Sequence, residues 1–293
     1  IEGEFKNIEL DKGLILYLPF EERYGNDVYD ASGNNITGTI YGANWTEGKF
    51  GKALSFDGFD DYVEVADSPS LRVPPNLTVA VWIIRFTHDA DYEGIITKWE
   101  QSATGYKGFL LQSMKDGTIR FLIGSGSYYA STNTSINDNE RVFIVGTYDG
   151  SNVRLYKNGV LVSSTSFTGG TYTSNPIEIG RRIHGVVGYF NGTIDEVRIY
   201  NRALSEEEIK ALYENTLVKF STSFYDLNLS KQYLSLIHEN GELFKIFLHS
   251  SFFSPYKLVY GLIPINSSNF YYYDWYKKEF KNGFFEFKPE LFK

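Results

Sequence analysis

The sequence predicts an all-β protein whose first 215 residues form a β-sandwich. Short apolar runs separated by turn residues recur along this stretch, as a two-layered antiparallel sandwich requires. Asp149-Gly150 and Asn158-Gly159 adopt positive φ at low cost, so we expect two successive hairpins between Thr147 and Val162. One short helix is expected after the last strand of the sandwich.

The last strand and this helix lie within residues 189–215. Apolar and charged residues alternate from Ile194 to Tyr200, which is typical of a strand with one face in water. Ser205 precedes Glu208 by three residues, the spacing of a capping box that begins a helix. Apolar side chains recur in that helix as one stripe, formed by Ile209, Leu212 and Tyr213.

Several sequence blocks occur in a characteristic order between residues 13 and 215. They are Gly13–Glu21, Asp30–Asn34, Gly48–Gly58, Asp60–Val65, Leu77–Ile84, Gly94–Trp99, Gly146–Gly150, Val153–Val162 and Pro176–Arg181. Together with the closing segment, they resemble the laminin-G-like family of concanavalin-like jelly-roll sandwiches. The resemblance implies a concanavalin-like jelly roll with a short C-terminal helix. One block departs from the family, because Val142–Val145 stands where a Trp-His pair is usual.

Residues 216–293 are expected to form a separate, small β extension that resembles no family we recognise. This segment holds 21 of the 50 aromatic residues in 78 positions. The expected strands are Leu234–His238, Leu243–Leu248, Leu258–Ile265, Phe270–Trp275 and Phe284–Phe287, with a turn at Asn240-Gly241. A unit this small cannot bury so many rings within itself, so they pack on the sandwich or form an assembly interface.

Composition excludes several functional classes. The net charge of −8 argues against nucleic acid as a partner, and the lack of cysteine excludes disulfides and thiolate metal sites. The most apolar stretch, Phe247–Ile265, contains His249, Pro255 and Lys257, so it does not predict a membrane span. Because the chain begins at Ile1 and its single methionine is Met114, we expect a processed N-terminus, most simply after secretion.

Glycosylation sequons are frequent, which predicts a glycosylated extracellular or cell-surface protein. Seven Asn-x-Ser/Thr triplets occur, where residue frequencies alone predict about three. They begin at Asn35, Asn44, Asn76, Asn133, Asn191, Asn228 and Asn266. The alternative is that loops rich in Asn, Ser and Thr generate such triplets by chance.

Catalytic residues are not evident. Glucanases with the concanavalin-like sandwich use a Glu-x-Asp-x-x-Glu run, which places its acids on one face of a strand. The nearest pair here, Asp195-Glu196, is expected to point to opposite faces, and Glu178 stands alone. The histidines also lack metal-ligand spacing. We therefore predict that the protein is not an enzyme.

A structural calcium ion is implied by the resemblance, since related jelly rolls hold one between the loop at Asp30 and the strand at Asp195. By motif, the ligands would be Asp30, Asn34 and Asp195. Alternatively, Asp30 forms an Asx turn and Asp195 pairs with an arginine. A second acidic group, Asp57, Asp60 and Asp61, is more typical of a solvated hairpin tip.

Glycan binding is a further possibility, because sugars pack on flat aromatic rings flanked by polar groups. The candidates are Trp45, Trp99, Tyr106, Tyr128 and Tyr129, of which Trp99 is the best single one. Core packing explains each ring equally well. Our first hypothesis is a non-catalytic protein of adhesion or of a surface assembly, whose partners are its own copies or other surface proteins. The alternative is a carbohydrate-binding, lectin-like module, ahead of a glycoside hydrolase.

Overall fold

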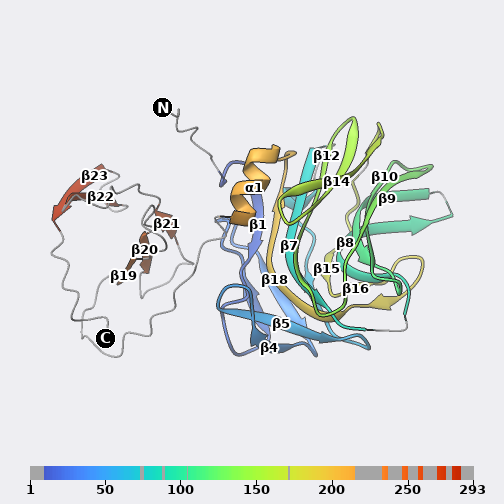
Figure 1. The fold of residues 1–293 in the computed structure, drawn as a ribbon, viewed down its shortest axis with the longest axis horizontal. Coiled ribbons are helices and arrows are strands. Elements are labelled where there is room, and N and C mark those ends of the chain that lie inside the picture. The colour runs from blue at the N-terminus through green and yellow to red at the C-terminus, as the bar shows by residue number, and fades with distance from the viewer. Residues whose placement is uncertain are drawn as a thin grey trace. The chain divides into compact units, whose positions relative to one another are not determined.

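The computed structural model describes residues 10–72, 76–87, 90–103, 105–170 and 172–214, with the backbone of five later strands. The chain divides into two compact units, Ile1–Thr216 and Leu217–Lys293. In the first unit, two antiparallel sheets form the layers of a sandwich (Figure 1). This architecture confirms the predicted all-β sandwich of two layers.

The first sheet has eight strands. In order they are β14 (Val160–Ser166), β13 (Asn152–Lys157), β12 (Arg141–Asp149), β7 (Asn76–Arg85), β18 (Asn191–Tyr200), β5 (Lys52–Asp57) and β4 (Asn44–Glu47). The eighth, β1 (Leu14–Leu18), pairs with the second half of β18. The expected hairpins are present, since β12, β13 and β14 pair in succession and both Asn158 and Gly159 have positive φ.

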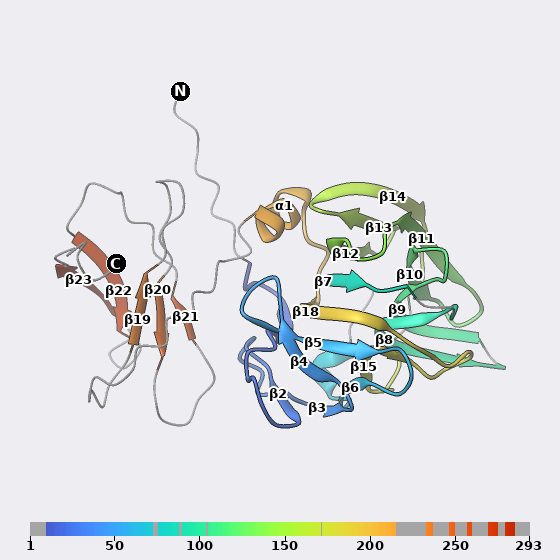
Figure 2. The same ribbon diagram turned by 60° about the horizontal axis from the view of Figure 1, so that its bottom comes forward.

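The second sheet has ten strands. Its main path runs through β11 (Tyr129–Ser135), β10 (Thr118–Gly124), β9 (Gly105–Ser113), β8 (Glu93–Ser102), β15 (Ile177–Ile179), β6 (Tyr62–Val65), β3 (Thr37–Tyr41) and β2 (Asp27–Tyr29). Two short strands, β16 (Arg181–Arg182) and β17 (Gly188–Tyr189), attach beside β8. A 3-10 turn, η1, covers Pro69–Leu71. Figure 2 shows the two layers from a second direction.

The main core lies between the sheets and follows the alternation of strand side chains. In β8, β9 and β10, Ile96, Phe109 and Phe121 point into this core. Their neighbours Trp99, Leu110 and Leu122 form a separate cluster on the opposite side of the sheet. We call that side, which faces away from the main core, the outer face of the ten-stranded sheet.

The helix α1 (Glu206–Glu214) covers the outside of the eight-stranded sheet. Its capping box forms as expected: the Ser205 N–H donates to Glu208 Oε2 at 2.8 Å, and the Glu208 N–H donates to Ser205 Oγ at 3.2 Å. Ile209 and Leu212 pack in a cluster with Trp82 and Phe143. Within the described part of the chain, α1 is too short to cross a membrane, and no other helix is long and apolar enough to do so.

The strand β18 differs from its prediction, because neither of its faces is in water. From Gly192 to Tyr200 every residue is buried. The alternation that suggested a wet face arises from Asp195, Glu196 and Arg198, whose charges are satisfied inside the protein. Buried charges that are paired therefore give the same alternation of apolar and charged residues as a strand with one face in water.

The second unit contains five described strands. A three-stranded sheet has the order β19 (Tyr233–Leu236), β20 (Ile246–His249) and β21 (Lys257–Val259), and β22 (Asn269–Asp274) pairs with β23 (Glu279–Phe284). They lie close to the expected positions, except that β23 ends where the expected strand begins. The turn predicted at Asn240-Gly241 and the sequons at Asn228 and Asn266 fall outside the described residues.

Candidate functional site

Three of the aromatic residues singled out from the sequence meet on the outer face of the ten-stranded sheet. Trp99 in β8, Tyr106 in β9 and Tyr129 in β11 have ring centroids 4.9–6.2 Å apart. The Tyr106–Tyr129 pair is edge-to-face, one of the favoured aromatic arrangements. We call these three residues the aromatic cluster.

The members of the aromatic cluster differ in exposure. Trp99 is only 3% exposed, so it supports the other rings and offers no open face of its own. Tyr106 is half-buried and Tyr129 is 46% exposed. Trp99, expected to be the best single candidate for stacking, therefore has no open ring face, and Tyr129 is the most exposed ring of the aromatic cluster.

Tyr128 and Trp45 do not join this cluster. Tyr128 lies just before β11, and its ring packs edge-to-face on Phe167, which belongs to the main core. It is 57% exposed, but no ring contact joins it to the three residues of the aromatic cluster. Trp45 in β4 packs partly against the main core, and its indole N–H donates to the Gly25 carbonyl at 3.3 Å. Trp45 therefore has the core-packing role that was the alternative to glycan binding for each of these rings.

A group of polar side chains lies beside the aromatic cluster. The Arg182 guanidinium donates from Nη1 to Gln112 Oε1 at 2.8 Å and from Nη2 to Gln101 Oε1 at 3.1 Å. Gln101 and Gln112 lie on β8 and β9, the two strands that also hold Trp99 and Tyr106. We call Gln101, Gln112 and Arg182 the polar centre. None of them was a candidate from the sequence, where nothing distinguished them from ordinary strand residues.

Glu178 has a partner that the sequence did not reveal. It lies directly opposite Glu64 across β15 and β6, so two carboxylates share the outer face. Arg181 lies between them, 2.5 Å from Glu178 and 3.5 Å from Glu64, and its guanidinium stacks 3.3 Å from the Tyr62 ring centroid. Although burial lowers the pKa of Arg181, the Glu178 carboxylate raises it above its ordinary value. The Glu178 carboxylate is thus held in place by the Arg181 guanidinium.

Asp195 and Glu196 do not point to opposite faces of β18. A bulge interrupts the pairing between Asp195 and Arg198, and Glu196 has a φ of 56° there. The bulge brings the Glu196 carboxylate to within 2.5 Å of Arg198 Nη2 and 2.9 Å of the Tyr17 hydroxyl. The Asp195 carboxylate accepts the backbone N–H of Lys49 at 2.7 Å. Both acids are therefore buried in contacts that hold β18 to its neighbours.

The residues expected to bind calcium have other contacts. Asp30 accepts the N–H of Tyr17 at 2.9 Å, and the N–H and hydroxyl of Ser32 at 2.8 and 2.7 Å. Asn34 donates to the Ile15 carbonyl at 3.1 Å. These bonds form an Asx turn at Asp30, which is the alternative interpretation. Because protein donors already surround the Asp30 oxygens, this set does not fit a calcium ion well, and calcium here stays a prediction.

The second acidic group is the one described set of three acids whose oxygens come within 4.8 Å of one another. Asp57 and Asp60 are exposed, whereas Asp61 is buried, so this is not a fully solvated tip. Burial raises the pKa of Asp61, and the neighbouring charges of Asp57 and Asp60 add to that effect. The Asp61 carboxylate accepts the Asp57 N–H at 2.9 Å and so closes the turn.

Five of the seven sequons lie in the described part of the chain. The side chains of Asn35, Asn44, Asn76 and Asn133 belong to exposed residues. Asn191 is half-buried, and its amide donates to the Thr87 carbonyl at 3.2 Å. Four positions are thus open to attachment of a sugar, which leaves glycosylation a prediction.

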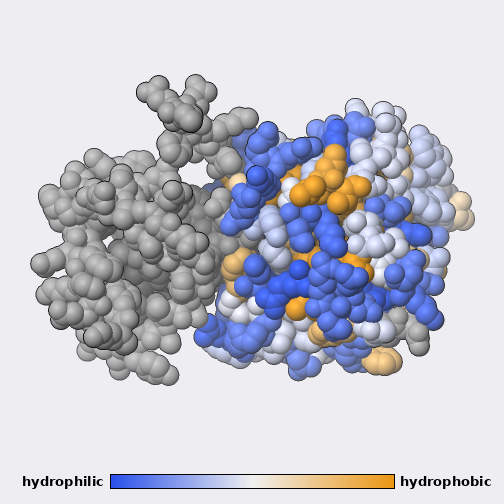
Figure 3. All heavy atoms as spheres, in the orientation of Figure 1, coloured by the Kyte–Doolittle hydropathy of each residue, from blue (hydrophilic) through white to orange (hydrophobic). Residues whose placement is uncertain are grey.

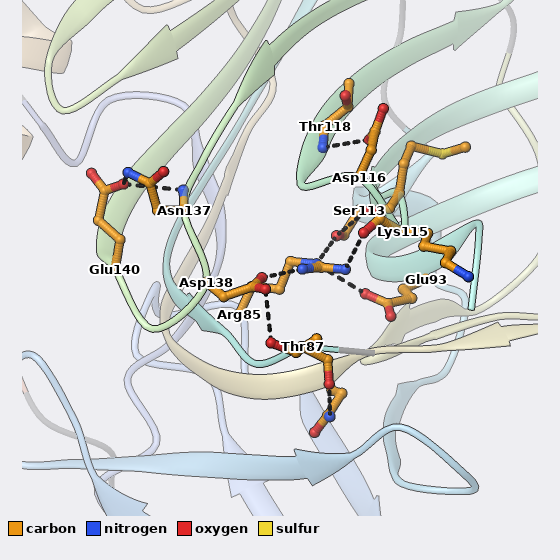
Figure 4. Close-up of polar contacts among 12 residues, drawn as sticks. Arg85, Thr87, Glu93, Ser113, Lys115, Asp116, Thr118, Asn137, Asp138 and Glu140 are labelled. Atoms are coloured by element: carbon orange, nitrogen blue, oxygen red, sulfur yellow. Dashed lines mark hydrogen bonds and ion pairs between the residues drawn. The ribbon is translucent and has the colours of Figure 1, made fainter. Parts of the chain in front are cut away.

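One end of the sandwich is closed by a buried ionic network (Figure 4). Arg85 is 1% exposed and forms ion pairs with Asp138 and with Glu93, the latter at 3.6 Å. Its Nε donates to Ser113 Oγ at 2.8 Å, and Nη2 donates to the Lys115 carbonyl at 3.1 Å. Partners from β8, β9 and two loops thus fix this cation, which makes the network structural.

The jelly-roll fold agrees with the family comparison. Residues 56–210, more than half of the chain, match the sequence profile described as the concanavalin A-like lectin/glucanases superfamily. The chain belongs to this superfamily. The laminin-G-like resemblance is therefore confirmed. A comparison with curated protein sequences finds no match.

Solved structures share the fold of this superfamily member. Domain 4 of AbnA, a GH43 extracellular arabinanase from Geobacillus stearothermophilus, in complex with arabinotriose, is 20% identical with a TM-score of 0.54, covering 68% of this chain and 98% of that one. The binding domain of Paraclostridial Mosquitocidal Protein 1 is 17% identical with a TM-score of 0.58, covering 92% and 80%. The binding domain of botulinum neurotoxin DC in complex with SialylT is 16% identical with a TM-score of 0.56, covering 83% and 63%. At these identities the likeness shows the fold alone.

Proposed function

We propose that this protein is a non-catalytic, extracellular saccharide-binding domain that uses the outer face of its ten-stranded sheet. The observation that carries the proposal is the exposed ring of Tyr129, supported from below by Trp99 and bordered by the polar centre. An apolar ring face with convergent polar groups is the composition that sugars require. Two fold neighbours were solved in complex with arabinotriose and with SialylT, which supports this choice among the functions of the superfamily.

The absence of catalysis is part of the proposal. A glycosidase needs one carboxyl that gives up a proton and a second that stays ionised, and both must be open to the substrate. Glu178 is buried and held by Arg181, while Asp195 and Glu196 are buried in β18. Release of reducing sugars by the wild type, lost in Glu178→Gln, would contradict this part of the proposal.

Tyr129→Ala should weaken binding to the saccharide at least tenfold, which corresponds to about 1.4 kcal/mol. The reason is that the substitution removes the most exposed ring of the aromatic cluster. A glycan array identifies a ligand, and isothermal titration of the full chain then measures the affinities.

The matched control is Tyr128→Ala, which removes a comparably exposed tyrosine one residue earlier that packs on Phe167 and not on the aromatic cluster. It should bind as the wild type does. Equal affinities for both variants would place the saccharide elsewhere on the molecule.

A second candidate function, self-association in a surface assembly, is favoured by the strand β14. It is the last strand of its sheet and contains no charged residue, although charges are the usual protection of an edge. Val160, Leu161 and Val162 are exposed there. The face drawn in Figure 3 is mostly blue and white, with orange patches between. Two copies that pair through this edge would bury the patch on both.

Self-association through β14 predicts a mass that rises with concentration in light scattering. The double variant Val160→Lys with Val162→Lys should stay monomeric, because charges on both copies would repel. Val186→Lys with Val187→Lys alters two exposed loop valines and should associate as the wild type does. A wild type that remains monomeric at all concentrations would remove this second function.

A further inference from the structure

Arg182 is a buried cation with only neutral partners. It is 7% exposed, and its three hydrogen-bond acceptors are Gln101 Oε1, Gln112 Oε1 and, at 3.2 Å from Nε, the His184 carbonyl. No carboxylate among the described residues forms an ion pair with it, and burial lowers the pKa of its guanidinium. Among the described residues, the positive charge of the polar centre therefore has no anionic partner.

The other strongly buried cations show how unusual this is. Arg85 pairs with Glu93, Arg198 with Glu196, and Lys98 with Asp67 at 2.7 Å. Each of these pairs follows the rule that buried charges are compensated, since removing an unpaired ion from water costs several kcal/mol. Arg182 departs from that rule on the outer face rather than in the main core.

The surroundings of Arg182 are those of the proposed binding site. Its guanidinium lies 5.4 Å from the Tyr92 ring centroid, and the hydroxyls of Tyr106 and Tyr129 are near enough to influence its pKa. The three acceptors occupy three of the five N–H groups of the guanidinium. One N–H on Nη1 and one on Nη2 therefore remain for a planar, two-oxygen acceptor.

We propose that Arg182 binds the carboxylate of an acidic saccharide, so that the ligands of this protein are glycans containing uronic or sialic acids. The inference rests on the proposed function and narrows it. A sugar that stacks on Tyr129 would direct its carboxylate to Arg182, where the ion pair compensates the buried charge. Gln101 and Gln112 hold the guanidinium in position for that contact.

The test uses the full chain and pairs of glycans that differ only in charge. Oligogalacturonate, hyaluronan oligosaccharides and sialyllactose are each compared with their carboxyl-reduced counterparts by isothermal titration. We expect at least one acidic glycan to bind and its reduced form to bind at least tenfold more weakly. The pair that shows this difference distinguishes a uronic from a sialic acid.

Arg182→Gln should remove this preference, so that the acidic and reduced glycans bind with equal, weak affinity. The matched control is Arg120→Gln, which removes one charge from the neighbouring strand β10, opposite Gln112, and should keep the preference. Thermal unfolding of both variants checks that they fold. If Arg182→Gln weakens both glycans of a pair by the same factor, Arg182 acts only structurally and the inference fails.

Failure of this inference is distinguishable from failure of the proposed function. Binding of neutral glycans alone, or equal binding of acidic and reduced forms to the wild type, overturns the acidic ligand class and leaves saccharide binding intact. Binding of no glycan in either form overturns both.

Discussion

Arg85→Met should lower the free energy of unfolding by about 3–5 kcal/mol, the usual effect of removing one partner from a buried ion pair. The substitution removes the Arg85 charge from the buried Glu93 carboxylate and deprives Ser113 and the Lys115 carbonyl of a donor. Methionine fills much of the space of the arginine stem, so the loss reports mainly on charge and hydrogen bonding. Urea denaturation followed by tryptophan fluorescence measures the change.

The control for this prediction is Arg154→Met. Arg154 pairs with Asp149 at 2.5 Å, but both side chains are about one-third exposed. Exposed pairs contribute about 0–1 kcal/mol, so this variant should unfold close to the wild type. Equal losses in the two variants would show that the buried network has no special role in stability.

Trp99→Ala should also destabilise the protein strongly, by about 3–5 kcal/mol, as large-to-small changes of buried aromatic residues do. Trp99 packs with Leu110 and Leu122 beneath Tyr106 and Tyr129, so its removal leaves a cavity under the outer face. Loss of glycan binding in this variant would therefore reflect collapse of the support. Thermal unfolding and glycan titration of the same sample reveal both effects.

Trp99→Phe is the informative companion. It keeps an aromatic ring and removes the indole N–H, which is buried without a hydrogen-bond partner. The expected loss is therefore smaller than in Trp99→Ala, because no polar group loses a partner. A Trp99→Ala protein as stable as the wild type would contradict the packing described for the aromatic cluster.

More of the fold than of the site could be predicted from the sequence, because the fold depends on local sequence patterns. Turn dipeptides such as Asn158-Gly159 and the capping box at Ser205 specify their structures within a few residues. The wet face predicted for β18 was wrong, since alternation of charge does not reveal that Arg198 and Glu196 pair inside the protein. Local sequence patterns thus predict the strands, turns and helix, but not which faces of them are buried by other parts of the protein.

The site depends on contacts between strands distant in the sequence. Tyr106 and Tyr129 could be chosen as aromatic candidates, yet nothing local separated Tyr129 from Tyr128, because the choice depends on which distant rings each one contacts. Glu178 and Glu64 lie opposite each other on neighbouring strands, although more than one hundred residues separate them in the sequence. Arg182 stands out because none of the described carboxylates pairs with it, and no sequence pattern reveals such a missing partner.

The position of a bound glycan tests the central claim most directly. A crystal structure of the full chain with the tightest glycan of the panel should show a sugar ring over Tyr129, with polar groups reaching Gln101 and Arg182. A saccharide bound instead at the loops around Asp30 and Asp195, with the Tyr129 ring left open to solvent, would contradict this account of the outer face.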